Sequence, residues 1–134
     1  MVKALKKAGL DDEEPGGKSS FGDIAEGLKP IILGAIEKVI VAGRNFSARI
    51  DSGAENSSIC ESLVGKFKLG PVVDEANVRS ANGSTSRDVI LIPIKLKGLD
   101  IVERFNVSDR RSMMYPVLIG RNILERGFLV DVTK

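Results

Sequence analysis

The tetrapeptide Asp51-Ser52-Gly53-Ala54 is the feature that most constrains how this chain can fold. The alternating segment Phe46-Ser47-Ala48-Arg49-Ile50 leads directly into it, so a strand is expected to end at an acidic turn. Asp is also a good turn former for a purely structural reason, because its side chain can bond the backbone two residues on. A second apolar segment, Val117-Leu118-Ile119, runs far downstream into Gly120-Arg121-Asn122. The two motifs together are more informative than either one alone.

The residue types available for catalysis exclude several classes of enzyme. The chain has no histidine, which excludes a serine hydrolase with a Ser-His pair and leaves the single cysteine, Cys60, without its usual base. A zinc site built from His and Cys ligands is disfavoured for the same reason, so we expect no metal and no cofactor. Cys60 stands in an apolar position and is predicted to be a small buried hydrophobic residue. Carboxylates are the groups left for hydrolysis.

The length and charge of the chain restrict its class and its partners. At 134 residues it is long enough for one domain with a self-sufficient core. It has 20 Lys and Arg residues against 18 Asp and Glu residues, and the positive ones are dispersed, so no nucleic-acid partner is expected. No apolar segment approaches the roughly 18 residues of a membrane span. The basic N-terminus leads into the acidic segment 11–14 and not into an apolar signal core, which together with the single cysteine predicts a cytoplasmic protein.

Composition divides the chain into a flexible N-terminal tail, residues 1–30, and a folded domain, residues 31–134. Short apolar or alternating segments in the domain are separated by turns that carry Gly and Asn, which predicts an all-β, closed or sandwich-like structure. Pro93 indicates an edge or a bend in its strand, and Asn82-Gly83 is typical of a hairpin turn. The expected strands cover residues 36–41, 46–50, 89–96, 101–107, 115–119 and 128–132, the expected helix covers 122–126, and 59–64 fits a short strand or a helical turn.

The two motifs resemble those of the retropepsins, the single-domain aspartic proteases of retroviruses and their cellular relatives. That family has an Asp-Thr/Ser-Gly-Ala loop and, downstream, two apolar residues followed by Gly, often continued as Gly-Arg-Asn and a short helix. Segments Ala48–Ala54 and Tyr115–Arg121 also resemble the RimK-associated bacterial and archaeal retropepsin-like proteins known as ATP-dependent zinc proteases. The resemblance covers about residues 33–134. It implies a retropepsin-like closed β-barrel, the acid protease fold, with one short C-terminal helix.

Peptide hydrolysis by carboxylates needs two of them close together. Like charges a few ångström apart cannot both ionise and so share one proton, and then one group takes a proton from water while the other polarises the carbonyl. The chain has a single Asp-Ser-Gly, so the second carboxylate must come from another chain. We therefore expect a twofold homodimer in which Asp51 and its symmetry mate form the catalytic dyad, with an acid pH optimum.

The resemblance also assigns roles within the catalytic loop. Ser52 replaces the commoner Thr, and its hydroxyl would bond across the dimer to steady the two loops. Gly53 would let the turn approach the partner closely, and Ala54 would give a small wall to the substrate groove.

Further supporting residues are implied behind the loop. Glu55 and Arg121 would form an ion pair, with solvent-exposed charges as the alternative. Leu118, Ile119 and Gly120 would pack beneath the catalytic loop and fix its position. The C-terminal strand 128–132 would interleave with its mate in a dimer sheet, or pair within its own chain.

A hairpin over residues 78–87 would act as the flap that closes over bound peptide and excludes water, with an ordinary hairpin as the alternative. It is more polar than viral flaps. The expected flap residues are Ser80, Ala81, Asn82, Gly83 and Ser84.

The leading interpretation is a cofactor-free, homodimeric aspartic endopeptidase that cleaves extended peptide or protein substrates. One alternative is a catalytically inactive retropepsin-fold module for peptide binding or dimerisation, and another is an unrelated β-barrel that happens to contain Asp-Ser-Gly. The sequence contains no Gly-rich phosphate-binding motif, so any ATP dependence would lie in a partner.

Overall fold

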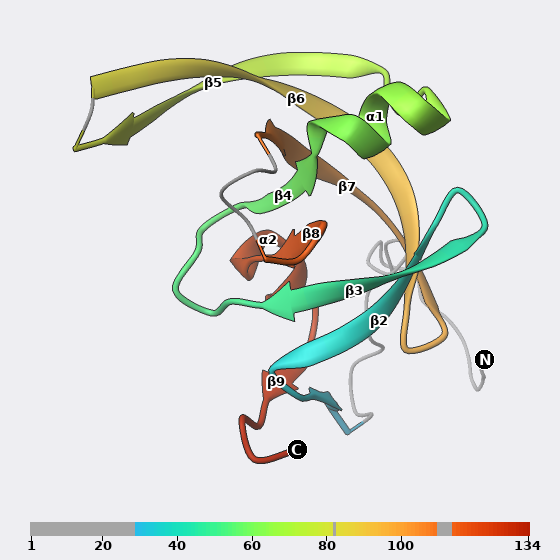
Figure 1. The fold of residues 1–134 in the computed structure, drawn as a ribbon. Coiled ribbons are helices and arrows are strands. Elements are labelled where there is room, and N and C mark those ends of the chain that lie inside the picture. Colours follow the sequence, from blue (N-terminus) through green and yellow to red (C-terminus); the bar gives the residue numbers. More distant parts are fainter. Residues whose placement is uncertain (1–28, 82, 110–113) are drawn as a thin grey trace, which may run out of the picture.

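The computed structural model describes residues 29–81, 83–109 and 114–134, which form nine strands and two short helices (Figure 1). In chain order the elements are β1 Ile31–Leu33, β2 Ile36–Val41, β3 Arg44–Ile50, β4 Ser57–Cys60, α1 Glu61–Phe67, β5 Val72–Ser80, β6 Gly83–Leu96, β7 Leu99–Ser108, β8 Val117–Ile119, α2 Arg121–Leu124 and β9 Phe128–Val130. None of the helices in the described part of the chain is long and apolar enough to cross a membrane.

Six of the strands close into a ring. β2 pairs with β3, β3 with β8, β8 with β4, β4 with β7 and β7 with β6, and β6 pairs back onto β2. β5 pairs with the first part of β6, so the β5–β6 hairpin extends beyond the ring (Figure 1). The all-β prediction is confirmed, and the expected short C-terminal helix is present as α2. A further helix, α1, directly follows β4, in the segment that fitted either a strand or a helical turn.

Two tight turns set the register of the ring. Ala42 and Gly43 join β2 to β3 with φ angles of 52° and 75°, and Lys97 and Gly98 join β6 to β7 with φ angles of 52° and 79°. Two-residue turns with positive φ at both positions match the right-handed twist of the strands that they connect. The tight first turn makes β3 start at Arg44, two residues before the expected strand, and it fixes which β3 side chains face the core.

Pro93 lies where β6 changes its neighbour. β6 pairs with β5 up to Ile90 and with β2 from Ile94 onward, while β7 pairs along its other side. Proline has no amide hydrogen to donate, so it fits the gap between the two pairings. This position is the one at which the sequence indicated an edge or a bend.

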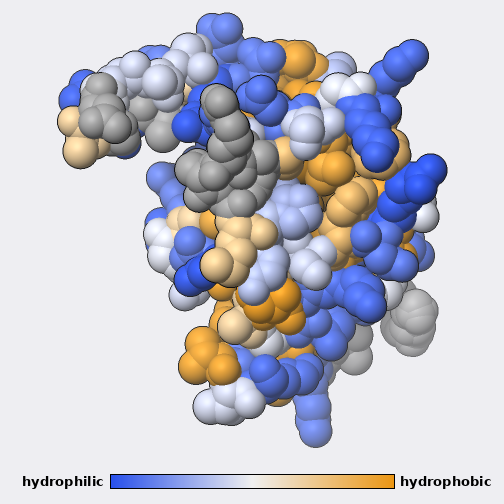
Figure 2. Space-filling view, in the orientation of Figure 1, coloured by the Kyte–Doolittle hydropathy of each residue, from blue (hydrophilic) through white to orange (hydrophobic). Residues whose placement is uncertain are grey.

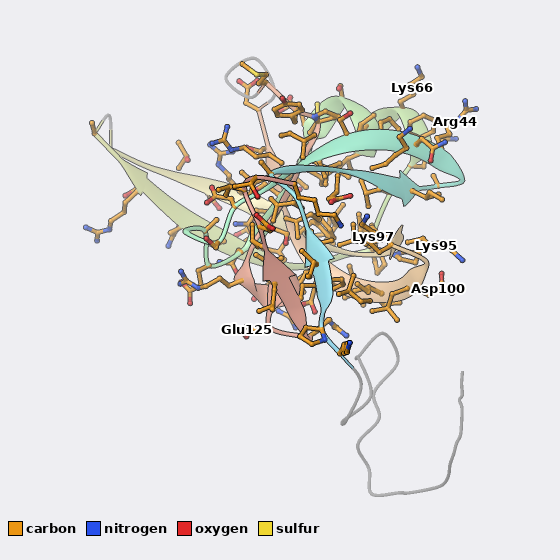
Figure 3. The ribbon with its side chains drawn as sticks, turned by 90° about the horizontal axis from the view of Figure 1, so that it is seen from below. Arg44, Lys66, Lys95, Lys97, Asp100 and Glu125 are labelled. Carbon is orange, nitrogen blue, oxygen red and sulfur yellow. The ribbon has the colours of Figure 1, made fainter. Side chains whose placement is uncertain are left out.

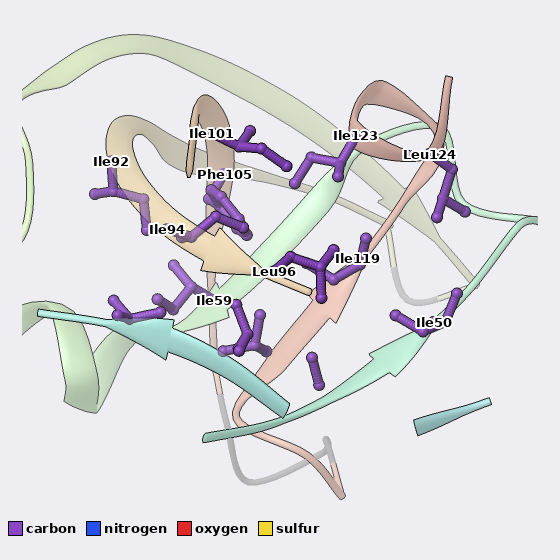
Figure 4. Packing of buried hydrophobic residues seen from close by; sticks show 14 of the residues in the cluster. Ile50, Ile59, Ile92, Ile94, Leu96, Ile101, Phe105, Ile119, Ile123 and Leu124 are labelled. Atoms are coloured by element: carbon purple, nitrogen blue, oxygen red, sulfur yellow. The ribbon is translucent and has the colours of Figure 1, made fainter. Parts of the chain in front are cut away.

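The hydrophobic core fills the ring and is built from alternating strand positions. On β6, Ile92, Ile94 and Leu96 are buried whereas Pro93 and Lys95 are exposed. Figure 4 shows one end of this core, where β3 and β8 finish; the labelled buried residues there are Ile50, Ile119, Ile123 and Leu124. The core therefore supports the segment in which the Asp51 motif begins.

The C-terminal strand pairs within its own chain. β9 runs parallel to β1, with Ile32 opposite Leu129. Both of these side chains are exposed, at 44% and 54%. Lys134 closes the arrangement by donating from its Nζ to the Ile32 carbonyl at 2.9 Å. Of the two arrangements open from the sequence, the described chain has the intrachain one.

Charged side chains point away from the core at the end where the β2–β3 turn meets α1. Arg44 and Lys66 lie there (Figure 3), 5.2 Å and 5.7 Å from the centre of the Phe67 ring. Because Arg44 begins β3 and Asp51 directly follows it, this cationic pair lies at the opposite end of the strand from the Asp51 motif.

Candidate active site

The Asp51 loop begins where β3 ends. The Asp51 amide donates to the Ile119 carbonyl at 2.9 Å, which extends the parallel pairing of β3 with β8 by one step. The Asp51 Oδ1 accepts a hydrogen bond from the Gly53 amide at 3.0 Å, and the Ala54 amide donates to the Asp51 carbonyl at 3.2 Å. Asp51 is half-buried, whereas Ser52 and Gly53 are exposed. The carboxylate is thus held in its own turn at the surface of the ring.

The Gly120 loop lies directly against the Asp51 loop. Gly120 is buried, and a Cβ built on it would meet the carbonyl oxygen of Asn56 and, at 2.9 Å, that of Ala54. The Arg121 amide donates to the Ala54 carbonyl at 2.8 Å. The fold therefore brings the two sequence motifs into backbone contact, and it leaves no space for a side chain at Gly120.

Two polar side chains join the loops: Asn122, which belongs to the Gly-Arg-Asn motif, and Ser57, which no sequence motif indicated. Ser57, at the start of β4, is the one buried polar residue in the described part of the chain. Its hydroxyl accepts a hydrogen bond from the Gly120 amide at 2.9 Å and donates to the Asn122 Oδ1 at 2.7 Å. The Asn122 Nδ2 donates in turn to the Arg104 carbonyl on β7 at 3.0 Å. The Gly-Arg-Asn motif pointed to Asn122, but the choice of Ser57 over Ser58 depends on the register of β4.

The expected ion pair between Glu55 and Arg121 is not among the ion pairs of the described residues, and that prediction was wrong. Instead, Arg121 Nη1 donates to the Ser52 carbonyl at 3.3 Å, and the Glu55 carbonyl accepts the Asn122 amide at 3.2 Å. Both charged side chains are exposed, where a pair would gain little over hydration. The Arg121 side chain therefore contacts the Asp51 loop, whereas Glu55 contacts the start of α2 through its backbone.

The outward face of β3 places a cation on the same side as the Asp51 carboxylate. Arg49 lies on β3, and Asp51 directly follows this strand and continues its pairing with β8, so the alternation of a strand would direct both side chains to the same face. Arg49 is exposed, and none of the ion pairs of the described residues includes it.

Leu118, opposite Arg49 on β8, is half-buried, whereas Ile119 and Gly120 are buried. Of the three residues expected beneath the loop, Leu118 is thus the least enclosed.

The β5–β6 hairpin carries the segment expected to act as a flap. Ser80 ends β5, and Ala81, Gly83 and Ser84 are exposed near the tip, with Gly83 at a φ of 111°. Asn82 lies outside the described residues. The hairpin projects on the same side of the molecule as the loop between β3 and β4 (Figure 1), and Figure 2 shows an open recess beneath its projecting part. The hairpin therefore projects over a recess on the side of the molecule that carries the loop between β3 and β4.

Three features together define a retropepsin-like protein. They are a closed ring of strands, an Asp-Ser-Gly loop at the end of a strand, and a helix that starts with Gly-Arg-Asn and holds this loop in place. The solution structure of a simian foamy virus protease matches with a TM-score of 0.54 at 17% identity, over 67% of this chain and 91% of the viral one. A crystal structure of a Legionella pneumophila protein of unknown function matches with a TM-score of 0.55 at 22% identity, over 78% of this chain and 95% of that one. These likenesses confirm the expected fold.

The chain belongs to the RimB-like family, described as "Retropepsin-like aspartic endopeptidase RimB", whose model matches residues 65–134, just over half of the chain. The matched segment contains the Gly120 loop and starts after Asp51. Two proteins named "Probable alpha-L-glutamate ligase", from Shewanella pealeana and Shewanella halifaxensis, are 33% and 32% identical in alignments of 111 residues, which cover 64% of this chain. The matched part spans only 24% of the length of these relatives.

Proposed function

We propose that this chain is one protomer of a homodimeric aspartic endopeptidase. The observation that carries the proposal is the contact between the Asp51 and Gly120 loops, which holds a half-buried carboxylate at a strand end. One chain supplies one such carboxylate, so a dyad requires Asp51 from each of two copies. Membership of the RimB-like family and the likeness to a viral protease fold support this assignment.

The dyad would work by sharing one proton. The ionised carboxylate takes a proton from water, whose oxygen bonds to the peptide carbonyl carbon, while the protonated carboxyl donates to the carbonyl oxygen. The carboxyl that took the proton from water then gives it to the amine nitrogen as the C–N bond of the tetrahedral intermediate breaks, and the other carboxylate recovers a proton from a hydroxyl of the intermediate. Ser52 would steady the paired loops across the dimer, Ala54 would line the groove, and the β5–β6 hairpin would close over the bound peptide.

We infer that the substrate is an extended peptide that carries acidic side chains. Arg49 leaves the same strand face as Asp51, and the Arg121 guanidinium lies against the Ser52 carbonyl. Guanidinium groups recognise carboxylates through charge-assisted hydrogen bonds. The names of the Shewanella relatives refer to the ligation of glutamate, which makes glutamate-containing peptides the first substrates to examine.

A second candidate function is a retropepsin-fold module that binds peptide or dimerises without cleaving it. The observation that favours it is the short matched part of the ligase-named relatives, 24% of their length, which places a similar segment beside much additional sequence. Such a module would use the same groove and the same twofold contact.

The deciding experiment measures cleavage of fluorogenic peptides, with and without consecutive glutamates, by the full chain. Asp51→Asn keeps the shape of the side chain but cannot share the proton, so it should lower kcat by about 10²–10⁴-fold. Asp100→Asn is the matched control, because Asp100 is exposed at the β6–β7 turn and pairs with Lys95 at 3.3 Å. Undiminished cleavage by Asp51→Asn would exclude the dyad. Peptide binding without cleavage by the parent chain would favour the module.

A further inference from the structure

We propose that Ser57 and Asn122 are positioning residues that set the place of the Asp51 carboxylate by locking the Gly120 loop. We call the hydrogen bonds that join Ser57, Asn122 and the Gly120 amide the lock. Its effect on catalysis rests on the proposed function, whereas the lock itself is a property of the fold. It deepens the proposed function by adding two side chains that touch neither substrate nor reacting atoms.

The lock is a directional chain of hydrogen bonds. A hydroxyl has one hydrogen, and that of Ser57 goes to the Asn122 Oδ1 at 2.7 Å, which turns the oxygen lone pairs toward the Gly120 amide at 2.9 Å. The other end of the Asn122 amide is anchored by the Arg104 carbonyl at 3.0 Å. These hydrogen bonds therefore fix the position of the Gly120 amide relative to β7, a central strand of the ring.

Burial makes these hydrogen bonds costly to lose. Ser57 is 0% exposed and Gly120 is buried, so the Gly120 amide depends on the Ser57 hydroxyl for its hydrogen bond. A buried donor left without an acceptor costs free energy, so the loop would move to recover a partner. Removing the hydroxyl should therefore displace the Gly120 loop.

The displacement would reach Asp51 along two routes. Ile119, which precedes Gly120, accepts the Asp51 amide at 2.9 Å, and Arg121, which follows Gly120, donates to the Ala54 carbonyl at 2.8 Å. Both ends of the Asp51 turn are thus hydrogen-bonded to residues adjacent to Gly120. In a twofold dyad the same shift would occur on both sides of the axis, where the two carboxylates must share one proton.

The first test is amide hydrogen exchange of the full chain by NMR, which needs no substrate. Ser57→Ala should speed exchange at Gly120 and Asp51 by about tenfold or more relative to core amides such as Ile94, because a buried hydrogen bond is lost. Ser58→Ala is the matched control, since Ser58 is the neighbouring, half-buried serine of β4. Unchanged exchange at Gly120 in Ser57→Ala would overturn the proposal.

The second test is kinetic and separates positioning from stability. Ser57→Ala and Asn122→Ala should each lower kcat about tenfold or more with little change in KM, and the double variant should be no worse than either one. Ser57→Thr, which keeps the hydroxyl, should recover kcat. A lowered unfolding midpoint with kcat unchanged in both single variants would show a merely structural role. If the parent chain cleaves no peptide, the proposed function fails, and the exchange measurement alone decides whether the lock exists.

Discussion

The backbone of Gly120 packs directly against the carbonyl group of Asn56, and no side chain fits between them. This contact joins the two halves of the candidate active site, because Asn56 follows the Asp51 loop and Gly120 opens the helix α2. Glycine is required here by close approach and not by its backbone angle, since the φ of Gly120 is −105°.

Replacing Gly120 by alanine should therefore destabilise the protein. A Cβ would overlap backbone atoms that cannot rotate away, so we expect the free energy of unfolding to fall by about 1–3 kcal/mol or more. Gly65→Ala is the control, because Gly65 lies in α1 and a Cβ there would meet no neighbouring atom within 4 Å. This second change should stabilise the protein by about 0.5–1 kcal/mol. Urea unfolding measures both, and equal stability of the two variants would contradict the close contact.

Reversing the charge of Arg49 should weaken the use of acidic substrates. Arg49→Glu places a carboxylate on the face that carries Asp51, so kcat/KM for glutamate-containing peptides should fall about tenfold or more, mainly through KM. Arg44→Glu is the matched control, because it makes the same change at the other end of β3, beside Phe67. Similar losses in the two variants would point to net charge and not to a local contact.

A charge on the two-stranded sheet of β1 and β9 should weaken the proposed dimer. Leu129 and Ile32 are exposed apolar partners on β9 and β1, and burying such a side chain contributes about 1.5–3 kcal/mol. We expect Leu129→Lys to raise the dimer dissociation constant at least about tenfold, as measured by sedimentation. Val102→Lys, an exposed change on β7, should leave the constant unaltered. A dimer insensitive to Leu129→Lys would place the twofold contact elsewhere.

Cleavage should be fastest at acid pH. The dyad is active only while it holds one proton, so kcat should decline as rising pH removes that proton. The measurement is a pH–rate profile accompanied by circular dichroism, which separates loss of the proton from loss of the fold. Cleavage that increased steadily above neutral pH would contradict the shared-proton mechanism.

Asp131 should titrate below its ordinary range. The Thr133 hydroxyl at 2.6 Å, with the Thr133 amide at 3.0 Å, holds the pKa of this exposed carboxyl below 3.8. A lowered pKa in the folded state contributes stability that is present above pH 3.8 and is lost as pH falls through the folded value. Thr133→Val removes the hydroxyl and should raise the pKa of Asp131, as followed by carboxyl carbon NMR. An unchanged pKa in this variant would assign the shift to another group.

Local patterns were enough to predict much of the ring. The alternation of Phe46–Ile50 and the turn at Asp51 gave the end of β3, and Pro93 marked the place where β6 changes its neighbour. These features depend on residues close in sequence, whose side-chain period and turn chemistry are local properties. The Glu55–Arg121 pair was predicted wrongly, because both side chains stay in water while backbone groups make the contact.

The sequence by itself determined most strands of the ring and the two motifs that meet at the candidate active site, because each of these is set by neighbouring residues. Only the tertiary structure decided that Ser57, and not Ser58, faces inward to bond Asn122 across 65 positions of the chain. It also decided that β9 pairs with β1 of its own chain. Such partners depend on the register of strands far apart in sequence, and a shift of one residue would exchange the buried and exposed faces.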